Sequence, residues 1–232
     1  MSESKAPSSD PQVPAFLQNK AIDPAATLSY IQDQISIIYR SARANQQDEH
    51  LLPPDHDTYT KIYTAIWQYT IAGGNRSNAA HLAGAEIYRV LEREIRSYCI
   101  DIREVIFTAS DDTDGNTPRK LLSGYVASYH RLANLSILMK NLMKYVERHW
   151  IRREIDEKKK NVYLIEDLHK LIWREEVLQI SAHNTLSKKG VEDLSDAVAA
   201  LQEANQGITE HDRKLITDVV KALASLSVTF DS

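Results

Sequence analysis

The sequence predicts an all-α fold, and three observations support this prediction. Apolar residues recur every three or four positions along most of the chain, as they do on the buried stripe of an amphipathic helix. No segment alternates apolar and polar residues for long enough to indicate a strand. Only seven glycines and seven prolines occur in 232 residues, so the chain has few of the turn signals that a many-stranded sheet needs.

The N-terminal elements can be placed from their start and stop signals. Residues 1–23 are rich in Ser, Pro and charge, and we expect them to form a disordered tail. Asp23-Pro24 pairs an N-cap residue with a proline at the first helical position, so the first helix is expected to begin there. After a break at residues 53–55, a second helix is predicted to run to Gly73-Gly74.

The remaining helices follow the same pattern. A third apolar stripe covers residues 87–105 and ends at the acidic turn DDTDGN. Thr117-Pro118 is another cap-plus-proline start, and it precedes a fourth stripe over residues 121–132. A fifth stripe covers 135–150, and three further helices are predicted near 161–180, 191–205 and 209–227.

Charge and cysteine content limit the possible partners and compartment. The formal net charge of −4 argues against nucleic acid or an anionic membrane as a partner, because both bind basic surfaces. The single cysteine, Cys99, excludes an internal disulfide and fits a reducing compartment. No run approaches the ~18 consecutive apolar residues of a membrane span, and the N-terminus has no apolar signal-peptide core. We therefore expect a soluble intracellular protein.

The sequence contains no pattern typical of a catalytic, cofactor or metal site. The acidic turn at 110–116 is similar to a calcium loop, but Leu121 stands where the bidentate glutamate would be. The eight histidines form no HExxH motif and no Cys/His metal spacing. His149, between Arg148 and Trp150, is interpreted as a packed, hydrogen-bonded histidine. Glycine-rich phosphate loops and nucleophile elbows are absent as well. We predict no catalytic residue, no cofactor and no metal, and hence a non-enzyme.

Two helices carry more apolar surface than one core contact requires. The second helix places Tyr59, Ile62, Tyr63 and Ile66 on one face, while Trp67 and Ile71 extend onto a neighbouring face. Either this helix is buried on two sides, or one face offers aromatic residues to a partner, since Tyr and Trp dominate interface hot spots. Met139 and Met143 in the fifth helix allow the same two interpretations, because methionine both fills cores and lines adaptable binding surfaces.

Four motifs, in this order and spacing, resemble the N-terminal region of cullins, the elongated scaffolds of multisubunit ubiquitin ligases. Residues 59–69, YTKIYTAIWQY, are similar to the family's YxxxYTxxYxY helix, and residues 84–88, GAEIY, to its G-x-E-L-Y helix opening. Residues 148–154, RHWIRRE, followed by Asp156 and Glu157, resemble its RHWVRRE-x-DE segment. Val162-Tyr163 and residues 173–175, WRE, fit its IY…WRD pattern. The similarity covers residues 24–227.

The resemblance implies a solenoid of stacked five-helix cullin repeats, in which each unit buries its open face on the next. Residues 24–155 would form the first repeat, and residues 156–232 the start of a second. The segment 148–175 would be the joint between them, with Trp150 and Trp173 packed at the seam and the arginines paired with nearby acids.

The resemblance also implies a function. In cullins of the SCF type, the second and fifth helices of the first repeat bind an adaptor of the BTB/POZ-like fold, which holds an F-box substrate receptor. The corresponding hydrophobic anchors of this chain would be Tyr59, Ile62, Tyr63, Ile66, Leu138, Met139, Leu142 and Tyr145. Such a protein is a non-catalytic scaffold, with no nucleic-acid or membrane partner, and it is expected in the cytoplasm and nucleus.

The sequence lacks the family's C-terminal region, which binds the RING subunit and carries the modified lysine. Two expectations follow from this difference. The chain is either a shortened form of a longer ligase scaffold, which the half-repeat after residue 160 favours, or a stand-alone regulator that sequesters the adaptor. A helical interaction scaffold unrelated to ubiquitin is the remaining alternative.

Overall fold

The computed structural model describes residues 23–44, 53–72, 79–108, 117–180, 189–203 and 209–228, and all regular secondary structure in these ranges is helical. The all-α prediction is confirmed for this part of the chain. The elements are α1 (Pro24–Ala44), α2 (His56–Ala72), α3 (Ala79–Thr108), α4 (Thr117–Leu142), α5 (Lys144–Val146), the π-helix η4 (Glu147–Ile151), α6 (Arg152–Asp156), α7 (Ile165–Glu176), α8 (Lys189–Glu203) and α9 (Glu210–Ser225).

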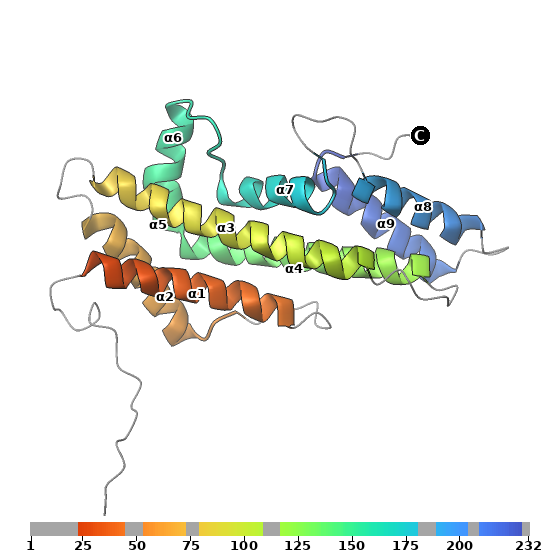
Figure 1. Cartoon of the computed structure of the whole chain (residues 1–232), viewed down its shortest axis with the longest axis horizontal. Helices are drawn as coiled ribbons and strands as arrows, with labels where there is room; N and C mark the ends of the chain where they lie inside the picture. The colour runs from red at the N-terminus through yellow and green to blue at the C-terminus, as the bar shows by residue number, and fades with distance from the viewer. Residues whose placement is uncertain are drawn as a thin grey trace, which may run out of the picture.

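Helices α3 and α4 form the centre of the molecule, and the other helices are layered against them (Figure 1). Helices α1 and α2 pack on one side of this pair, while α7, α8 and α9 pack on the other. The elements α5, η4 and α6 form one helical segment, residues 144–156, that rises steeply away from the end of α4. Among the described helices, none combines the length and the apolar character that crossing a bilayer requires.

Local capping explains where several helices begin. The amide of Ala25 donates to Oδ1 of Asp23 at 3.0 Å, which confirms the predicted start of α1. At the start of α2, Oδ1 of Asp55 accepts from the amides of Asp57 and Thr58, both at 3.0 Å. These bonds, led by the one from Thr58, favour the carboxylate and lower the pKa of Asp55.

The predicted division between the fourth and fifth helices is wrong. Helix α4 continues to Leu142, and the chain bends at Met143, whose backbone (φ −98°, ψ 17°) departs from helical values. Leu138, Met139 and Leu142 therefore lie on α4, and only Tyr145 lies on the next helical segment. The stretch around Met143 contains no glycine or proline, and Asn141 is its only residue of a capping type, so the sequence gives little indication of the bend.

The helix predicted from residue 161 begins at Ile165 instead. Lys158 (φ 58°) and Asn161 (φ 65°) adopt left-handed backbone conformations, which a right-handed helix cannot include. Tyr163 is held outside the helix by Tyr88 of α3, because the Tyr88 hydroxyl accepts from its amide at 2.9 Å and donates to its carbonyl at 3.2 Å.

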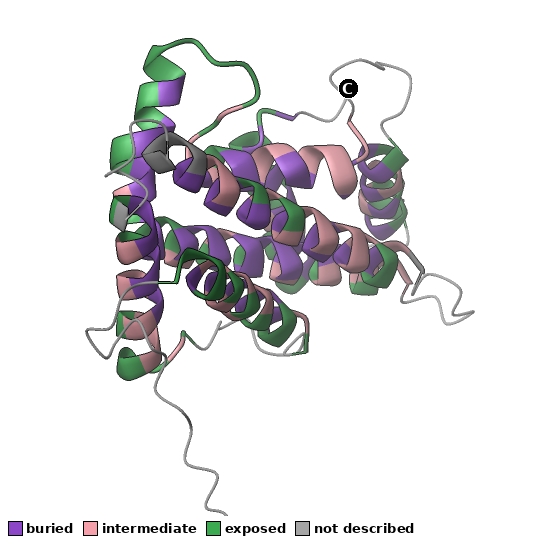
Figure 2. Ribbon diagram, turned by 60° about the vertical axis from the view of Figure 1, so that its left-hand side comes forward, coloured by how far each residue is buried: buried purple, intermediate pink, exposed green. Residues whose placement is uncertain are grey.

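One apolar core runs from α1 to α9 and crosses the predicted repeat boundary at residue 155 (Figure 2). Trp173 of α7 is fully buried and packs on Tyr125 and Tyr129 of α4, with ring centroids 5.9 and 5.8 Å apart. Helices α7–α9 thus bury their apolar stripes on the central pair, as stacking of one unit on the next requires. The assignment of residues 24–155 and 156–232 to two repeats stays a prediction.

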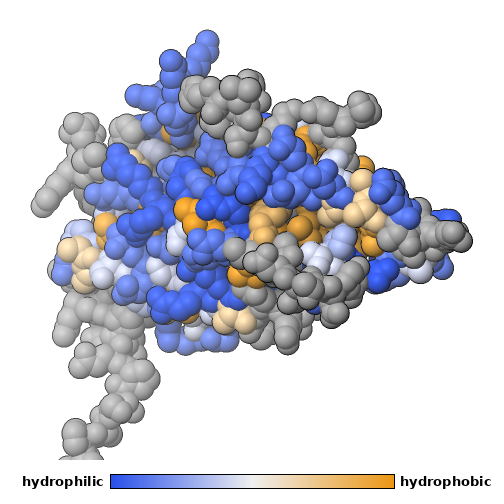
Figure 3. Space-filling view, turned by 45° about the vertical axis from the view of Figure 1, so that its right-hand side comes forward, coloured by the Kyte–Doolittle hydropathy of each residue, from blue (hydrophilic) through white to orange (hydrophobic). Residues whose placement is uncertain are grey.

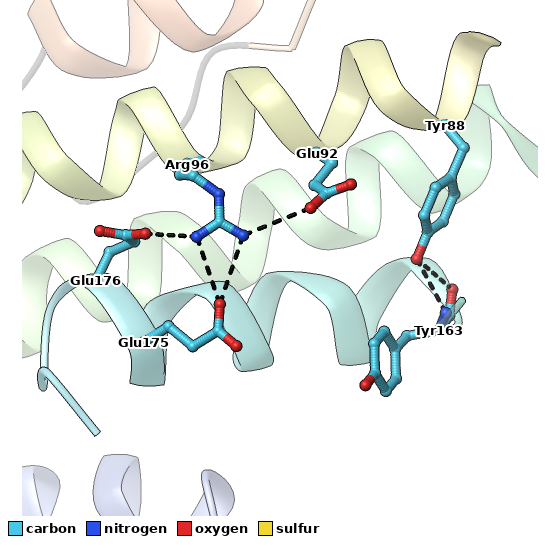
Figure 4. Close-up of polar contacts among 6 residues, drawn as sticks. All are labelled: Tyr88, Glu92, Arg96, Tyr163, Glu175 and Glu176. Atoms are coloured by element: carbon cyan, nitrogen blue, oxygen red, sulfur yellow. Dashed lines mark hydrogen bonds and ion pairs between the residues drawn. The ribbon is translucent and has the colours of Figure 1, made fainter. Parts of the chain in front are cut away.

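Polar contacts also hold α7 on α3 (Figure 4). The guanidinium of Arg96 reaches Glu176 at 2.5 Å, and Glu175 and Glu92 at 3.4 Å each. Deeper in the core, the Tyr39 hydroxyl of α1 lies 2.7 Å from Nε2 of His169 on α7. The pair Arg96–Glu92 lies within α3, but the other contacts join residues distant in sequence and therefore fix how α7 sits on the first helices.

Candidate binding surface

Helix α2 has one face in the core and another in solvent. Ile62 and Ile66 are 0% and 1% exposed, so they belong to the core. Tyr59 and Tyr63 are half-buried at its edge, and burial, followed by the proximity of Tyr63, raises the pKa of Tyr59. Trp67 is 41% exposed. The stripe of Tyr59, Tyr63 and Trp67 therefore runs from the edge of the core into solvent.

The position of α1 shows which side of α2 this stripe occupies. Tyr30 of α1 lies within electrostatic range of Lys61 and Asp57 of α2. Tyr59 and Tyr63 are two positions from these residues, and such a spacing places them on the opposite side of a helix. The tyrosines are thus turned away from α1. Helix α2 also packs against α4 and α5, the elements that carry the other predicted anchors.

The predicted anchors on α4 and α5 are likewise divided between the core and the surface. Met139 and Leu142 are 0% exposed, whereas Leu138 and Tyr145 are half-buried. The Tyr145 ring packs on the ring of the exposed His149, with centroids 4.3 Å apart. We name the group Tyr59, Tyr63, Trp67, Tyr145 and His149 the α2–α5 surface. The His149 ring packs on Tyr145, but the residue lies exposed on the outside of the molecule, and its predicted hydrogen bonding stays a prediction.

Half of the predicted anchors are therefore corrected by the structure. Ile62, Ile66, Met139 and Leu142 have almost no surface to offer, so they support the α2–α5 surface from below and cannot touch a partner in this conformation. They were inferred from the resemblance to the family's second and fifth helices, but they also lie on strong apolar stripes, and such a stripe is the one that faces the core. Trp67 and His149 were absent from the predicted set, although aromatic character at the edge of a stripe was a signal for Trp67.

Residues 84–88 position the π-helix η4 beside this surface. A Cβ atom at Gly84 would lie 2.3 Å from Cγ of Trp150, so only glycine allows this approach. Trp150 is 6% exposed and packs on Tyr88, with ring centroids 5.4 Å apart. Glu86 accepts a hydrogen bond from the hydroxyl of Tyr69 on α2. The GAEIY motif thus connects α3 to α2 and to η4, which carries His149 of the α2–α5 surface.

Both tryptophans of the predicted joint at 148–175 are buried, but they pack at different places, and the role of this segment as a joint between two repeats stays a prediction. Trp150 lies against the N-terminal part of α3, whereas Trp173 lies against α4. Of the arginines, Arg153 pairs with Glu157 at 3.4 Å and approaches Glu154 at 3.8 Å.

Within the described ranges, no group of three or more His, Cys, Asp or Glu side chains is arranged to hold a metal ion. The calcium-like turn at 110–116 lies outside the described residues. Cys99 is buried, and burial raises its pKa, so its thiol stays protonated and inert at neutral pH.

Fold and surface together define a helical scaffold of stacked units that presents an aromatic surface. The chain belongs to the cullin family, because the family model described as the cullin alpha solenoid domain matches residues 29–231. The predicted solenoid class is thereby confirmed. Family membership also favours the cullin interpretation over a helical scaffold of unrelated origin.

Similarity to individual proteins points to the same family. Cullin-1 of Caenorhabditis elegans is 26% identical over 213 residues, which are 85% of this chain and 24% of that protein. Cullin-1 of Dictyostelium discoideum is 27% identical over 125 residues, or 49% of this chain and 15% of that protein. Cell division control protein 53 of Saccharomyces cerevisiae is 22% identical over 167 residues, which are 66% of this chain and 19% of that protein. The chain therefore spans about a quarter or less of the length of these relatives.

Proposed function

We propose that this chain is the adaptor-binding part of a cullin-type ubiquitin ligase scaffold and that it has no catalytic role of its own. Its partner would be an SCF-type adaptor of the BTB/POZ fold, which would bring an F-box substrate receptor, in the cytoplasm and nucleus. Family membership and the similarity to two Cullin-1 proteins support this proposal.

The observation that carries the proposal is the exposure of aromatic side chains on two adjoining elements, α2 and α5. Large aromatic groups that are only partly buried in the free protein can bury the rest of their area against a partner, and such residues dominate binding energies. Tyr63 lies between Tyr59 and Trp67 on α2, so it is expected near the centre of the contact. Leu138 and Tyr145 would add apolar area from the other element.

The test is adaptor binding by the Tyr63→Asp variant, measured by calorimetry with a purified SCF-type adaptor. A carboxylate in the centre of an apolar contact loses its hydration on binding, so we expect affinity to fall by about 30-fold or more, corresponding to at least ~2 kcal/mol. The helical circular-dichroism signal should be retained, because Tyr63 is only half-buried.

Val105→Asp is the matched control. Val105 is 44% exposed and lies near the end of α3 that is remote from α5, so the same new charge there should leave affinity unchanged (Figure 1). Unaltered binding by Tyr63→Asp would show that the surface is elsewhere, and unfolding of that variant would place Tyr63 in the core. A specific complex of this kind forms at ~10 μM. If the unmodified chain did not bind the adaptor at this concentration, the adaptor function would be refuted.

A further inference from the structure

Three basic side chains of the helical segment 144–156 are exposed, whereas two of its acidic side chains are buried. Lys144, Arg148 and Arg152 are exposed, whereas Glu147 and Glu154 are only 6% and 4% exposed. In the sequence these acids balance the bases and argue against a basic surface. In the folded chain Glu147 and Glu154 point inward, so Lys144, Arg148 and Arg152 reach solvent together. The exposed acids Asp156 and Glu157 lie only at the C-terminal end of the segment, beyond Arg152. We name Lys144, Arg148 and Arg152 the basic ridge.

The buried acids are occupied by other contacts. The carboxylate of Glu147 accepts from the amide of Ile165 at 3.3 Å, where it lies at the N-terminus of α7 and interacts favourably with the helix dipole. Glu154 lies beside Arg153 at 3.8 Å. Neither acid therefore neutralises the ridge at the surface.

The geometry of the segment keeps the ridge on one line. Its residues are four positions apart, a spacing that places side chains on one face of a helix. Arg148 lies within the π-helix η4 and Arg152 directly follows it. The wider turn of a π-helix reduces the sideways drift that four-residue spacing has in an α-helix. The hydrogen bond that Lys140 of α4 donates to Glu166 is the largest influence on the pKa of Lys140 and raises it. Arg152 lies close enough to Lys140 to lower this pKa slightly.

The ridge cations differ from their neighbours in their pairing. Lys140 pairs with Glu166 at 2.6 Å, and Arg153 pairs with Glu157 at 3.4 Å. By contrast, none of Lys144, Arg148 and Arg152 forms an ion pair with any residue that the structure describes. Three aligned cations are thus available to a partner in a chain whose formal net charge is −4.

The ridge also adjoins the α2–α5 surface. Tyr145 directly follows Lys144, and His149 directly follows Arg148, so the aromatic and basic residues occupy neighbouring lines of one helical segment. A partner seated on the aromatic residues would meet the cations at the edge of its contact, where charges increase association rates and set orientation.

We infer that the basic ridge binds an acidic segment of the adaptor that occupies the α2–α5 surface; this inference rests on the proposed function. Charge complementarity and the shared helical segment favour a protein partner. A nucleic acid is disfavoured, because three cations make few phosphate contacts, and the net negative charge of the chain repels a polyanion.

The experiment measures adaptor association rates for a triple variant, K144E/R148E/R152E, by stopped flow. The matched control is K158E/K159E/K160E, which makes the same charge change at three exposed lysines just beyond α6. At ~50 mM salt we expect the ridge variant to associate about tenfold more slowly than the unmodified chain, and the control less than about twofold more slowly. At ~500 mM salt the difference should largely disappear.

Equal association rates for the ridge variant and the control at every salt concentration would overturn the inference while leaving the proposed function intact. Failure of the unmodified chain to bind the adaptor at all would refute the proposed function itself. The inference would also be overturned if the chain bound a single-stranded oligonucleotide or phosphatidylserine vesicles more tightly than it binds the adaptor, and if only the ridge variant lost that binding. Circular dichroism should show the same helicity in all variants, since every substituted side chain is exposed.

Discussion

Replacing Gly84 by alanine tests whether the close contact between α3 and η4 determines how the two elements pack. Gly84 lies within α3, and an added Cβ would be 2.3 Å from Cγ, 2.6 Å from Cδ1 and 2.8 Å from Cβ of Trp150. The Cβ of Trp150 is bonded directly to the backbone, so a change of rotamer cannot move it away. Either helix must shift to relieve the contact.

The expected magnitude follows from two opposing effects. Gly→Ala in an open helix interior stabilises by about 1 kcal/mol, because alanine restricts the unfolded chain more than glycine does. Overpacking a tight core costs about 1–3 kcal/mol, and the backbone-attached contact places Gly84→Ala near the upper value. The net loss is therefore about 2 kcal/mol, which lowers Tm by roughly 4–8 °C in a chain of this size.

Gly124→Ala provides the control, because a Cβ at Gly124 of α4 would meet nothing within 4 Å. It should raise Tm by roughly 2–4 °C, since only the gain in helix propensity remains. Thermal unfolding followed by circular dichroism measures both shifts. If Gly84→Ala raised Tm as Gly124→Ala does, Trp150 would not lie against Gly84 and the explanation given for the GAEIY motif would be wrong.

Two further predictions concern buried side chains of α7. Burial lowers the pKa of His169 from its usual 6.5 to about 4, so between these pH values the unfolded chain binds a proton that the folded chain does not. The free energy of unfolding should therefore fall by up to ~1.4 kcal/mol per pH unit as the pH drops from about 6.5 to about 4. Urea titrations at several pH values measure this slope, and a His169→Gln variant with the same slope would contradict it. Trp173→Ala should cost about 3–5 kcal/mol because its ring is fully buried, whereas Trp67→Ala should cost under about 1 kcal/mol. Equal losses in urea unfolding would show that the two tryptophans are buried alike.

The aromatic stripe of α2 shows how far the sequence predicts the binding surface. Periodicity identified most of the apolar residues of this helix, but it missed the buried Ala65 and Tyr69 and assigned Ile62 and Tyr63 to the same face. Adjacent positions lie about 100° apart on a helix, so a neighbouring helix can bury one and leave the other at the edge. Which of them is covered depends on the positions of α1 and α5, and helical period alone does not specify these.

Local chemistry by itself determined the helical class, the N-cap at Asp23 and the motifs that indicate the family, because each depends on residues close together in sequence. The tertiary structure alone decided the bend at Met143, the burial of Ile62 and Ile66, and the inward orientation of Glu147 and Glu154. Burial and helix direction result from contacts between residues far apart in the chain. For that reason a segment with mixed charge in the sequence presents a basic ridge in the folded protein.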